Sequence, residues 1–295
     1  MRLGVAPHRL WPAHEDELDG VLETTRTAEE LGFDHIIASS HLLAGATGVT
    51  PDPLVLLSAA AGATGRIGLV TSVLILPLYN PAVVAHQAAT LDRLSGGRLT
   101  LGVGTGWDTA EFDAAGVPFA GRGRRADEQL DAVRKLWRDE AEVRFGVRPR
   151  TPGAPVWVGG HSDAARRRAV RYGDAWHGFG LDAAGLAEVR GRLAGLGEEA
   201  GRDPATPLEL TAGQVLVPPG FEAVVQPSGW RPLGGAAPTA ERVREELGEL
   251  ADAGLTACSL WLPVATEALS DALAWVAEEV LSHFSQEWRI RLTVK

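Results

Sequence analysis

Short runs of apolar residues recur along the chain, and helical patterns of apolar residues separate them. Several runs are nearly continuous in valine, isoleucine and leucine, which is typical of strands buried on both faces of a parallel sheet. We predict eight such strands, at Arg2–Ala6, Phe33–Ala38, Ile67–Leu76, Leu99–Val103, Pro155–Gly159, Asp174–Phe179, Leu208–Val217 and Leu255–Leu262.

Helical patterns fill the gaps between these strands. Before the fourth strand, Asn80 can cap a helix and Pro81 suits its first turn, while Gly96 and Gly97 end it. Another helix, Asp163–Tyr172, follows the fifth strand. Three further faces carry apolar residues at helical spacing: Leu18, Val21, Leu22, Thr25 and Ala28; Ala126, Leu130, Val133 and Trp137; and Leu269, Ala272, Leu273, Val276 and Val280.

This alternation predicts an α/β fold, a single (β/α)8 TIM barrel over residues 1–281. A doubly wound open sheet is the alternative, because periodicity does not distinguish a closed sheet from an open one. The segments Asp139–Ala154 and Pro218–Pro238 are longer than ordinary connections. The second would be an irregular insertion at the C-terminal face, either a lid or a surface excursion. Residues 282–295 continue no helical face and form a C-terminal tail: an exposed end, an added strand or an oligomer contact.

Composition and charge exclude several classes of function. The 295 residues are 45% hydrophobic, enough for a large core, and 28 basic against 38 acidic residues give a net charge of −10. This charge argues against a nucleic-acid partner. The single cysteine, Cys258, excludes disulfides and zinc clusters, so we expect no metal and a reducing compartment. We see no signal peptide or membrane-spanning run, and we expect a cytoplasmic protein with no membrane partner.

The ends of the second and third strands carry candidate chemistry, because catalytic groups of a barrel follow the C-terminal ends of its strands. His41 directly follows the second strand, and a histidine there can exchange a proton near neutral pH. A histidine in a polar loop without a chemical role is the alternative. The third strand has Thr71–Val73 at its centre and ends in Pro77, which suggests a bend, although a plain buried strand is the default.

Glycines mark the ends of the fourth and fifth strands. The run Gly102–Gly106 (GVGTG) looks superficially like a dinucleotide fingerprint, but its third glycine is misplaced and no helix follows at once, so we reject that function. Trp107 comes next, as core packing or as a cofactor wall. The segment Gly159–Ser162 precedes a helix, so its backbone N–H groups form a candidate phosphate site to which His161 and Ser162 could add donors. An ordinary capped turn is the alternative.

Taken in order, these motifs resemble the luciferase-like monooxygenase superfamily. The matching features are the N-terminal LGV strand, SSH after the second strand, TSVLILP followed by NP, LDRLSGGRLTLGVGTGW, the RGRRADEQL helix and VWVGGHSDAARRRA. They cover residues 1–180 strongly and the rest through the spacing of strands. Each motif alone is weak, but the combination is specific. Within the superfamily, the chain looks most like the actinobacterial branch of F420-dependent oxidoreductases.

The resemblance implies a barrel that binds FMN or the deazaflavin coenzyme F420 at its C-terminal face. Ser72 and Val73 fall where the family often has a non-prolyl cis peptide against the flavin ring, and Thr105 and Gly106 fall at the edge of that ring. His41 matches a histidine that is proposed to handle a proton during hydride transfer. Backbone amides of four consecutive residues would receive the cofactor phosphate: Gly159, Gly160, His161 and Ser162.

Two residues depart from the family pattern. Many relatives have aspartate where this chain has Ser40, and the glucose-6-phosphate dehydrogenase branch has glutamate where this chain has Trp107. The second departure disfavours sugar phosphates and suggests a more hydrophobic substrate.

The resemblance therefore implies an F420-dependent oxidoreductase that transfers a hydride between the deazaflavin and a small organic molecule. One alternative is an FMN-dependent monooxygenase that uses O2 and reduced flavin from a partner reductase. A second alternative is a barrel that binds flavin without turnover. Relatives in this family are often dimers, so a homodimer is also an expectation.

Overall fold

Parallel strands of the chain close into one barrel. The computed structural model describes residues 1–45, 48–141, 145–150, 153–225 and 229–284. The strands in this part of the chain are β1 (Arg2–Val5), β2 (His35–Ala38), β3 (Gly68–Thr71), β4 (Leu74–Ile75), β5 (Leu99–Gly104), β6 (Val156–Gly159), β7 (Ala175–Phe179), β8 (Glu209–Val215) and β9 (Leu255–Trp261). Their order is β3-β2-β1-β9-β8-β7-β6-β5-β4, and a further pairing of β3 with β5 closes the sheet. The predicted closed barrel is confirmed, and the open sheet is excluded.

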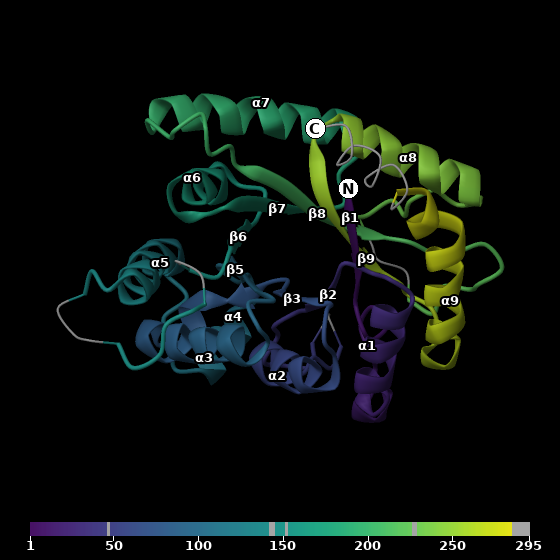
Figure 1. Cartoon of the computed structure of the whole chain (residues 1–295), viewed down its shortest axis with the longest axis horizontal. Helices are drawn as coiled ribbons and strands as arrows, with labels where there is room; N and C mark the ends of the chain where they lie inside the picture. The colour runs from purple at the N-terminus through teal and green to yellow at the C-terminus, as the bar shows by residue number, and fades with distance from the viewer. Residues whose placement is uncertain (46–47, 142–144, 151–152, 226–228, 285–295) are drawn as a thin grey trace.

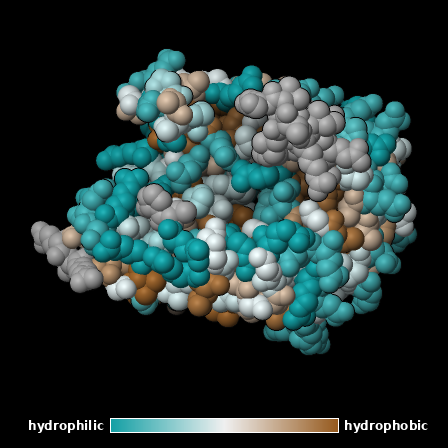
Figure 2. Space-filling model, viewed as in Figure 1, coloured by the Kyte–Doolittle hydropathy of each residue, from teal (hydrophilic) through white to brown (hydrophobic). Residues whose placement is uncertain are grey.

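Helices surround this barrel on its outside (Figure 1). They are α1 (Val21–Glu30), α2 (Pro53–Ala63), α3 (Pro81–Leu94), α4 (Thr109–Ala114), α5 (Arg122–Arg138), α6 (Asp163–Tyr172), α7 (Ala183–Glu199), α8 (Ala240–Asp252) and α9 (Leu269–Val276), the last continued by a π-helical turn, Ala277–Leu281. Two predicted caps are confirmed: the Asn80 side chain accepts from the first amides of α3, and Ser162 accepts from the amide of Ala165 in α6. In the same view, hydrophilic residues cover much of the face shown in Figure 2.

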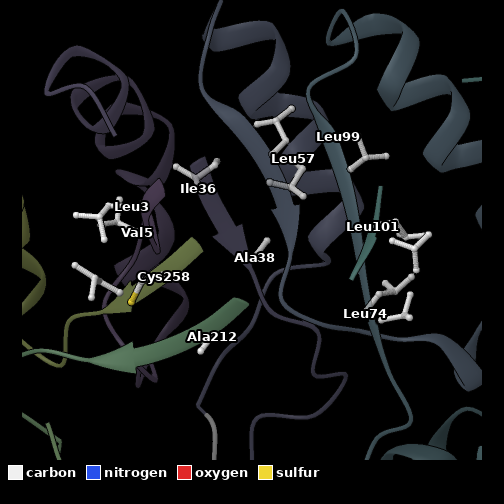
Figure 3. Packing of buried hydrophobic residues seen from close by; sticks show 14 of the residues in the cluster. Leu3, Val5, Ile36, Ala38, Leu57, Leu74, Leu99, Leu101, Ala212 and Cys258 are labelled. Atoms are coloured by element: carbon white, nitrogen blue, oxygen red, sulfur yellow. The ribbon is translucent and has the colours of Figure 1, made fainter. Parts of the chain in front are cut away.

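The apolar core lies in two places. The larger cluster fills the space between the outside of the barrel and the helices, and includes Ile36, Leu57 and Leu99 (Figure 3). A smaller cluster, which includes Ile37 and Val70, lies inside the barrel. Neighbouring residues of a strand, such as Ile36 and Ile37, therefore belong to different cores, as alternation along a strand requires.

The third strand is interrupted, as its sequence suggested. β3 ends at Thr71 and β4 begins at Leu74, with a cis peptide bond between Ser72 and Val73. The Val73 side chain lies against three glycines of the neighbouring strands, at positions 102, 104 and 159. A Cβ atom at Gly104 would lie 2.6 Å from Val73 Cγ2, so this close approach requires glycine. The glycines of β5 thus make room for the Val73 side chain at the bend and do not mark a dinucleotide site.

The two long segments contain no helix or strand within the described residues. The second, Pro218–Pro238, follows β8 at the C-terminal end of the barrel, as predicted. Of the tail, residues 285–295 lie outside the described residues. None of the described helices combines the length and apolar character needed to cross a bilayer.

Candidate functional site

A cavity of about 420 Å3 opens at the C-terminal ends of the strands. Its wall is mostly aromatic, and the residues that line it are His8, Leu10, Trp11, Pro12, Ser39, His41, Thr50, Ser72, Trp107, Phe179, Trp230 and Trp261. Among these lining residues there is no aspartate, glutamate, lysine or arginine. The cavity is therefore suited to a planar molecule with little charge.

The floor of the cavity is a hydrogen-bonded group inside the barrel. Ser72 Oγ lies 3.0 Å from Nε2 of His177 on β7, and His177 Nδ1 lies 2.9 Å from Thr211 Oγ1 on β8. The His177 ring stacks on Trp157 of β6, with ring centroids 5.3 Å apart. Burial lowers the pKa of His177 to about 4, so its ring is neutral near pH 7.

His41 is held by a buried carboxylate. Its Nδ1 lies 3.2 Å from Oε1 of Glu111 on α4, and the same oxygen accepts from the Leu42 amide at 2.6 Å. Glu111 is 1% exposed. Because a carboxylate accepts, Nδ1 carries the proton in a neutral ring and Nε2 is left as the free nitrogen. Among the described residues, no hydrogen-bond partner of Nε2 is present.

Trp107 lies beside this histidine at the rim of the cavity. The ring centroids of His41 and Trp107 are 5.7 Å apart, and Trp107 is 58% exposed. Gly106, just before it, has a φ of 71°, and its carbonyl accepts from Arg122 Nε at 3.0 Å. A Cβ at Gly106 would lie 2.7 Å from Ile75, so the turn that presents Trp107 depends on glycine.

The turn after β6 lies at the N-terminus of α6, and several of its polar groups already have partners. The Gly160 amide donates to the His177 carbonyl at 3.2 Å, and His161 Nε2 accepts from the Phe179 amide at 3.2 Å. Ser162 is used as the cap of α6. The amides of Asp163 and Ala164 have no partner among the described residues, because the first amides of a helix lack intrahelical acceptors.

The structure thus brings together some of the predicted site residues and separates others. His41 and Ser72 line one cavity, and Thr105 and Gly106 lead into Trp107 on its rim. The segment Gly159–Ser162 does not line the cavity, but its His161 binds the backbone of Phe179, which does.

Sequence reasoning did not assign several residues to the site, among them His8, Trp11, Glu111, Trp230 and Trp261. His8 lies just beyond the C-terminal end of β1, and this position was the signal that could have found it. Glu111 had no such signal, because only the tertiary contact joins it to His41. No group of three or more His, Cys, Asp or Glu in the described ranges is placed to hold a metal ion.

Comparison with known proteins decides the family. The family model described as luciferase-like monooxygenase matches residues 3–233. The chain belongs to the luciferase-like monooxygenase family. The match spans β1 to β8 together with Trp230, and so includes most of the wall of the cavity.

Two of the curated relatives have names that state an activity. An F420-dependent glucose-6-phosphate dehydrogenase of Intrasporangium calvum is 36% identical over 174 residues, which are 53% of this chain and 52% of the relative. A 4-hydroxyprotoasukamycin monooxygenase of Streptomyces nodosus subsp. asukaensis is 33% identical over 174 residues, 54% of this chain and 47% of the relative. The chain thus spans about half the length of the curated relatives it matches.

The fold has a close counterpart among solved structures. The crystal structure of the monooxygenase RslO1 from Streptomyces bottropensis superposes with a TM-score of 0.78 and 21% identity, over 96% of this chain and 100% of that one. The barrel fold is therefore shared over nearly the whole chain.

Proposed function

We propose that this protein is an F420-dependent oxidoreductase that transfers a hydride between the deazaflavin and an uncharged, fairly hydrophobic organic substrate. The observation that carries the proposal is the single cavity that holds His41, Ser72 and Trp107, from three strand ends that are separate in sequence. An FMN-dependent monooxygenase is the second candidate, because one of the relatives is named a monooxygenase. In that case a partner reductase would supply the reduced flavin.

The residues of the cavity fit a flat coenzyme ring. Aromatic side chains form its walls, and the Ser72–His177 pair forms a closed floor. When bound, the coenzyme supplies the ring carbon that carries the hydride. Ser72, Val73, Thr105 and Gly106 would hold the ring from the side of β3 and β5.

The phosphate of the coenzyme would be held at the turn Gly159–Ser162. The amides of Asp163 and Ala164, which follow this turn at the start of α6, have no partner among the described residues. They lie at the positive end of the α6 dipole. The buried Nε of Arg166 on the same helix also has no partner in the described part of the chain. These unused donors support a bound anion, although the protein as a whole is acidic.

His41 would hold or move the proton that accompanies the hydride. Its Nδ1 is engaged by Glu111, so the proton-accepting Nε2 is the atom left for the substrate. This paired arrangement favours turnover over the second alternative, a barrel that only binds flavin. Trp107 occupies the rim without a charge and so supports a hydrophobic substrate.

Titration of the coenzyme-free protein with F420 and with FMN, followed by the fluorescence of each ring, tests the proposal. We expect F420 to bind at micromolar concentration or below and more tightly than FMN. The deazaflavin riboside without its phosphate is the control, and we expect it to bind more weakly. Tighter binding of FMN would favour the monooxygenase, and binding of neither coenzyme would refute the proposed function.

A further inference from the structure

A second histidine lies in the wall of the same cavity, with one nitrogen unused. His8 follows β1, lines the cavity and is 3% exposed. Its Nδ1 lies 2.9 Å from the carbonyl oxygen of Arg9. Because a carbonyl only accepts, Nδ1 carries the proton, and Nε2 of the neutral ring is an acceptor. Nε2 is buried and has no hydrogen-bond partner within the described residues.

The loop that carries His8 is held firmly. The Leu10 amide donates to the Leu262 carbonyl at 3.0 Å, which joins the loop to the end of β9. Arg9 forms an ion pair with Glu17, and Glu17 also accepts from the Thr266 hydroxyl at 2.7 Å. His8 therefore cannot easily turn outward to find water. Burial lowers the pKa of His8, so protonation does not relieve the unused acceptor near pH 7.

Aromatic rings surround this acceptor on one side of the cavity. The Trp261 ring lies edge-on to His8, with centroids 5.9 Å apart. Trp230 lies between Phe179, at 4.4 Å, and Trp11, at 5.9 Å. Trp11 has a φ of 56°, a left-handed conformation that is uncommon for so large a residue and is found at functional sites. This wall offers flat apolar surfaces and one hydrogen-bond acceptor.

The wall lies opposite the proposed coenzyme side. His8, Trp230 and Trp261 come from the ends of β1, β8 and β9, which are neighbours in the barrel. The proposed coenzyme contacts come from the ends of β3, β5 and β6, on the other side of the closed sheet. The unused acceptor on the β1 side is therefore placed to bind the substrate, which is the second molecule in the cavity beside the coenzyme.

We propose that His8 Nε2 accepts a hydrogen bond from a hydroxyl or N–H group of an uncharged, planar aromatic substrate held among Trp11, Trp230 and Trp261. The inference rests on the proposed function, because the same cavity takes the coenzyme. It narrows the substrate class in two ways. The substrate carries no charge, because no charged side chain lines the cavity, and it carries a donor, because the buried atom of this wall that lacks a partner within the described residues, His8 Nε2, is an acceptor.

Calorimetric titration with a matched pair of probes tests this inference. 2-Naphthol has the donor and 2-methoxynaphthalene lacks it, while the two share the aromatic rings. In the full-length protein loaded with its coenzyme, we expect naphthol to bind about 3- to 10-fold more tightly than the ether, as a net hydrogen bond provides. His8→Phe keeps a flat ring but removes the acceptor, so it should weaken naphthol binding to the level of the ether.

Two further variants keep the test decisive. His8→Gln restores an acceptor and should retain the preference for naphthol. His86 is exposed on α3, so the control variant His86→Phe should leave the preference for naphthol unchanged. Equal binding of both probes to the wild type, or a preference that survives His8→Phe, would overturn the inference. A loss of coenzyme affinity in His8→Phe with the preference intact would assign the donor to the coenzyme and also overturn it. Coenzyme affinity is measured separately, so its complete absence would refute the proposed function instead.

Discussion

The floor and the mouth of this barrel use the same residue type in opposite ways. On the floor, both ring nitrogens of His177 have hydroxyl partners, and Nε2 of His35, at the start of β2, lies 2.8 Å from the Ser259 hydroxyl. At the mouth, His8 and His41 both line the cavity, and within the described residues Nε2 of neither ring has a hydrogen-bond partner. A satisfied histidine maintains the structure, whereas a histidine with an unused nitrogen is ready for a ligand. The comparison separates residues that stabilise the fold from residues that bind.

Acid should affect the floor most strongly. Burial lowers the pKa of His177 to about 4 and that of His35 to about 3, whereas an unfolded histidine has a pKa of about 6.5. Between these values the unfolded chain binds protons that the folded chain does not, so stability is complete above pH 6.5 and falls as the pH drops towards 4. We expect a loss of about 1.4 kcal/mol per pH unit for each histidine. Urea unfolding from pH 7 to pH 5 measures this slope.

Matched variants assign the slope to the floor. His177→Gln should reduce the slope, since one of the buried rings whose pKa is lowered is gone. Gly191→Ala on α7 removes no titratable group and should leave it unchanged. An equal slope in all three proteins would mean that other groups control the acid sensitivity, and the comparison of floor and mouth would lose its energetic basis.

Loss of the mouth histidine should affect turnover and spare the fold. We expect His41→Ala to lower kcat by ~100- to 10,000-fold, the usual range for a positioned acid or base, with the coenzyme dissociation constant nearly unchanged. Single-turnover oxidation of the reduced coenzyme measures this effect, with His86→Ala on the outside of α3 as the control. Full activity of His41→Ala would exclude a role in proton transfer.

The sequence predicted the strands of the barrel better than the contacts on the floor inside it. All eight predicted strands are present, because continuous apolar runs between glycine and proline signals depend only on local sequence. α2 was not predicted, because its residues are apolar on every side and give no helical periodicity. The bend at Ser72 was suggested by local sequence, but its bond to His177 joins opposite sides of the barrel and has no local signal.

The residues at the mouth were predicted only in part, because the contacts between distant segments have no local signal in the sequence. His41 could be found because it directly follows a strand, and the resemblance to a family gave its role. Its partner Glu111 lies 70 residues away in the chain, and no spacing rule links the two. The unpaired nitrogen of His8 is a property of the packed structure, since only the contacts of the described residues show that it has no partner among them.

Packing at the bend of the third strand should be costly to disturb. A Cβ at Gly102 would lie 1.9 Å from the backbone oxygen of Thr71, which cannot move without breaking the sheet. We expect Gly102→Ala to lower the free energy of unfolding by about 1–3 kcal/mol, as overpacking does. Gly191, on α7, has no atom within 4 Å of the added Cβ, so Gly191→Ala should raise it by about 0.5–1 kcal/mol. Chemical denaturation of both variants gives the comparison, and a neutral Gly102→Ala would show that the strand can shift.

The smallest effect should come from the carboxylate behind His41. In Glu111→Gln, the amide oxygen can take the place of Oε1 and keep the 2.6 Å bond from the Leu42 amide, while the amide N–H group takes the place of Oε2, 3.3 Å from His41 Nδ1. Nδ1 must then accept, so the proton moves to Nε2 and the ring presents a donor to the cavity. We expect kcat to fall about 10-fold, the low end of what loss of a carboxylate behind a histidine costs in metal sites.

The position of the proton separates this role from simple loss of structure. Nitrogen-15 NMR of His41 should show the proton on Nδ1 in the wild type and on Nε2 in Glu111→Gln. Glu128→Gln, which removes an exposed carboxylate beside Arg124, should change neither the tautomer nor kcat. If kcat fell while the proton stayed on Nδ1, Glu111 would belong with the floor as a structural group. In that case the boundary between floor and mouth would pass between Glu111 and His41.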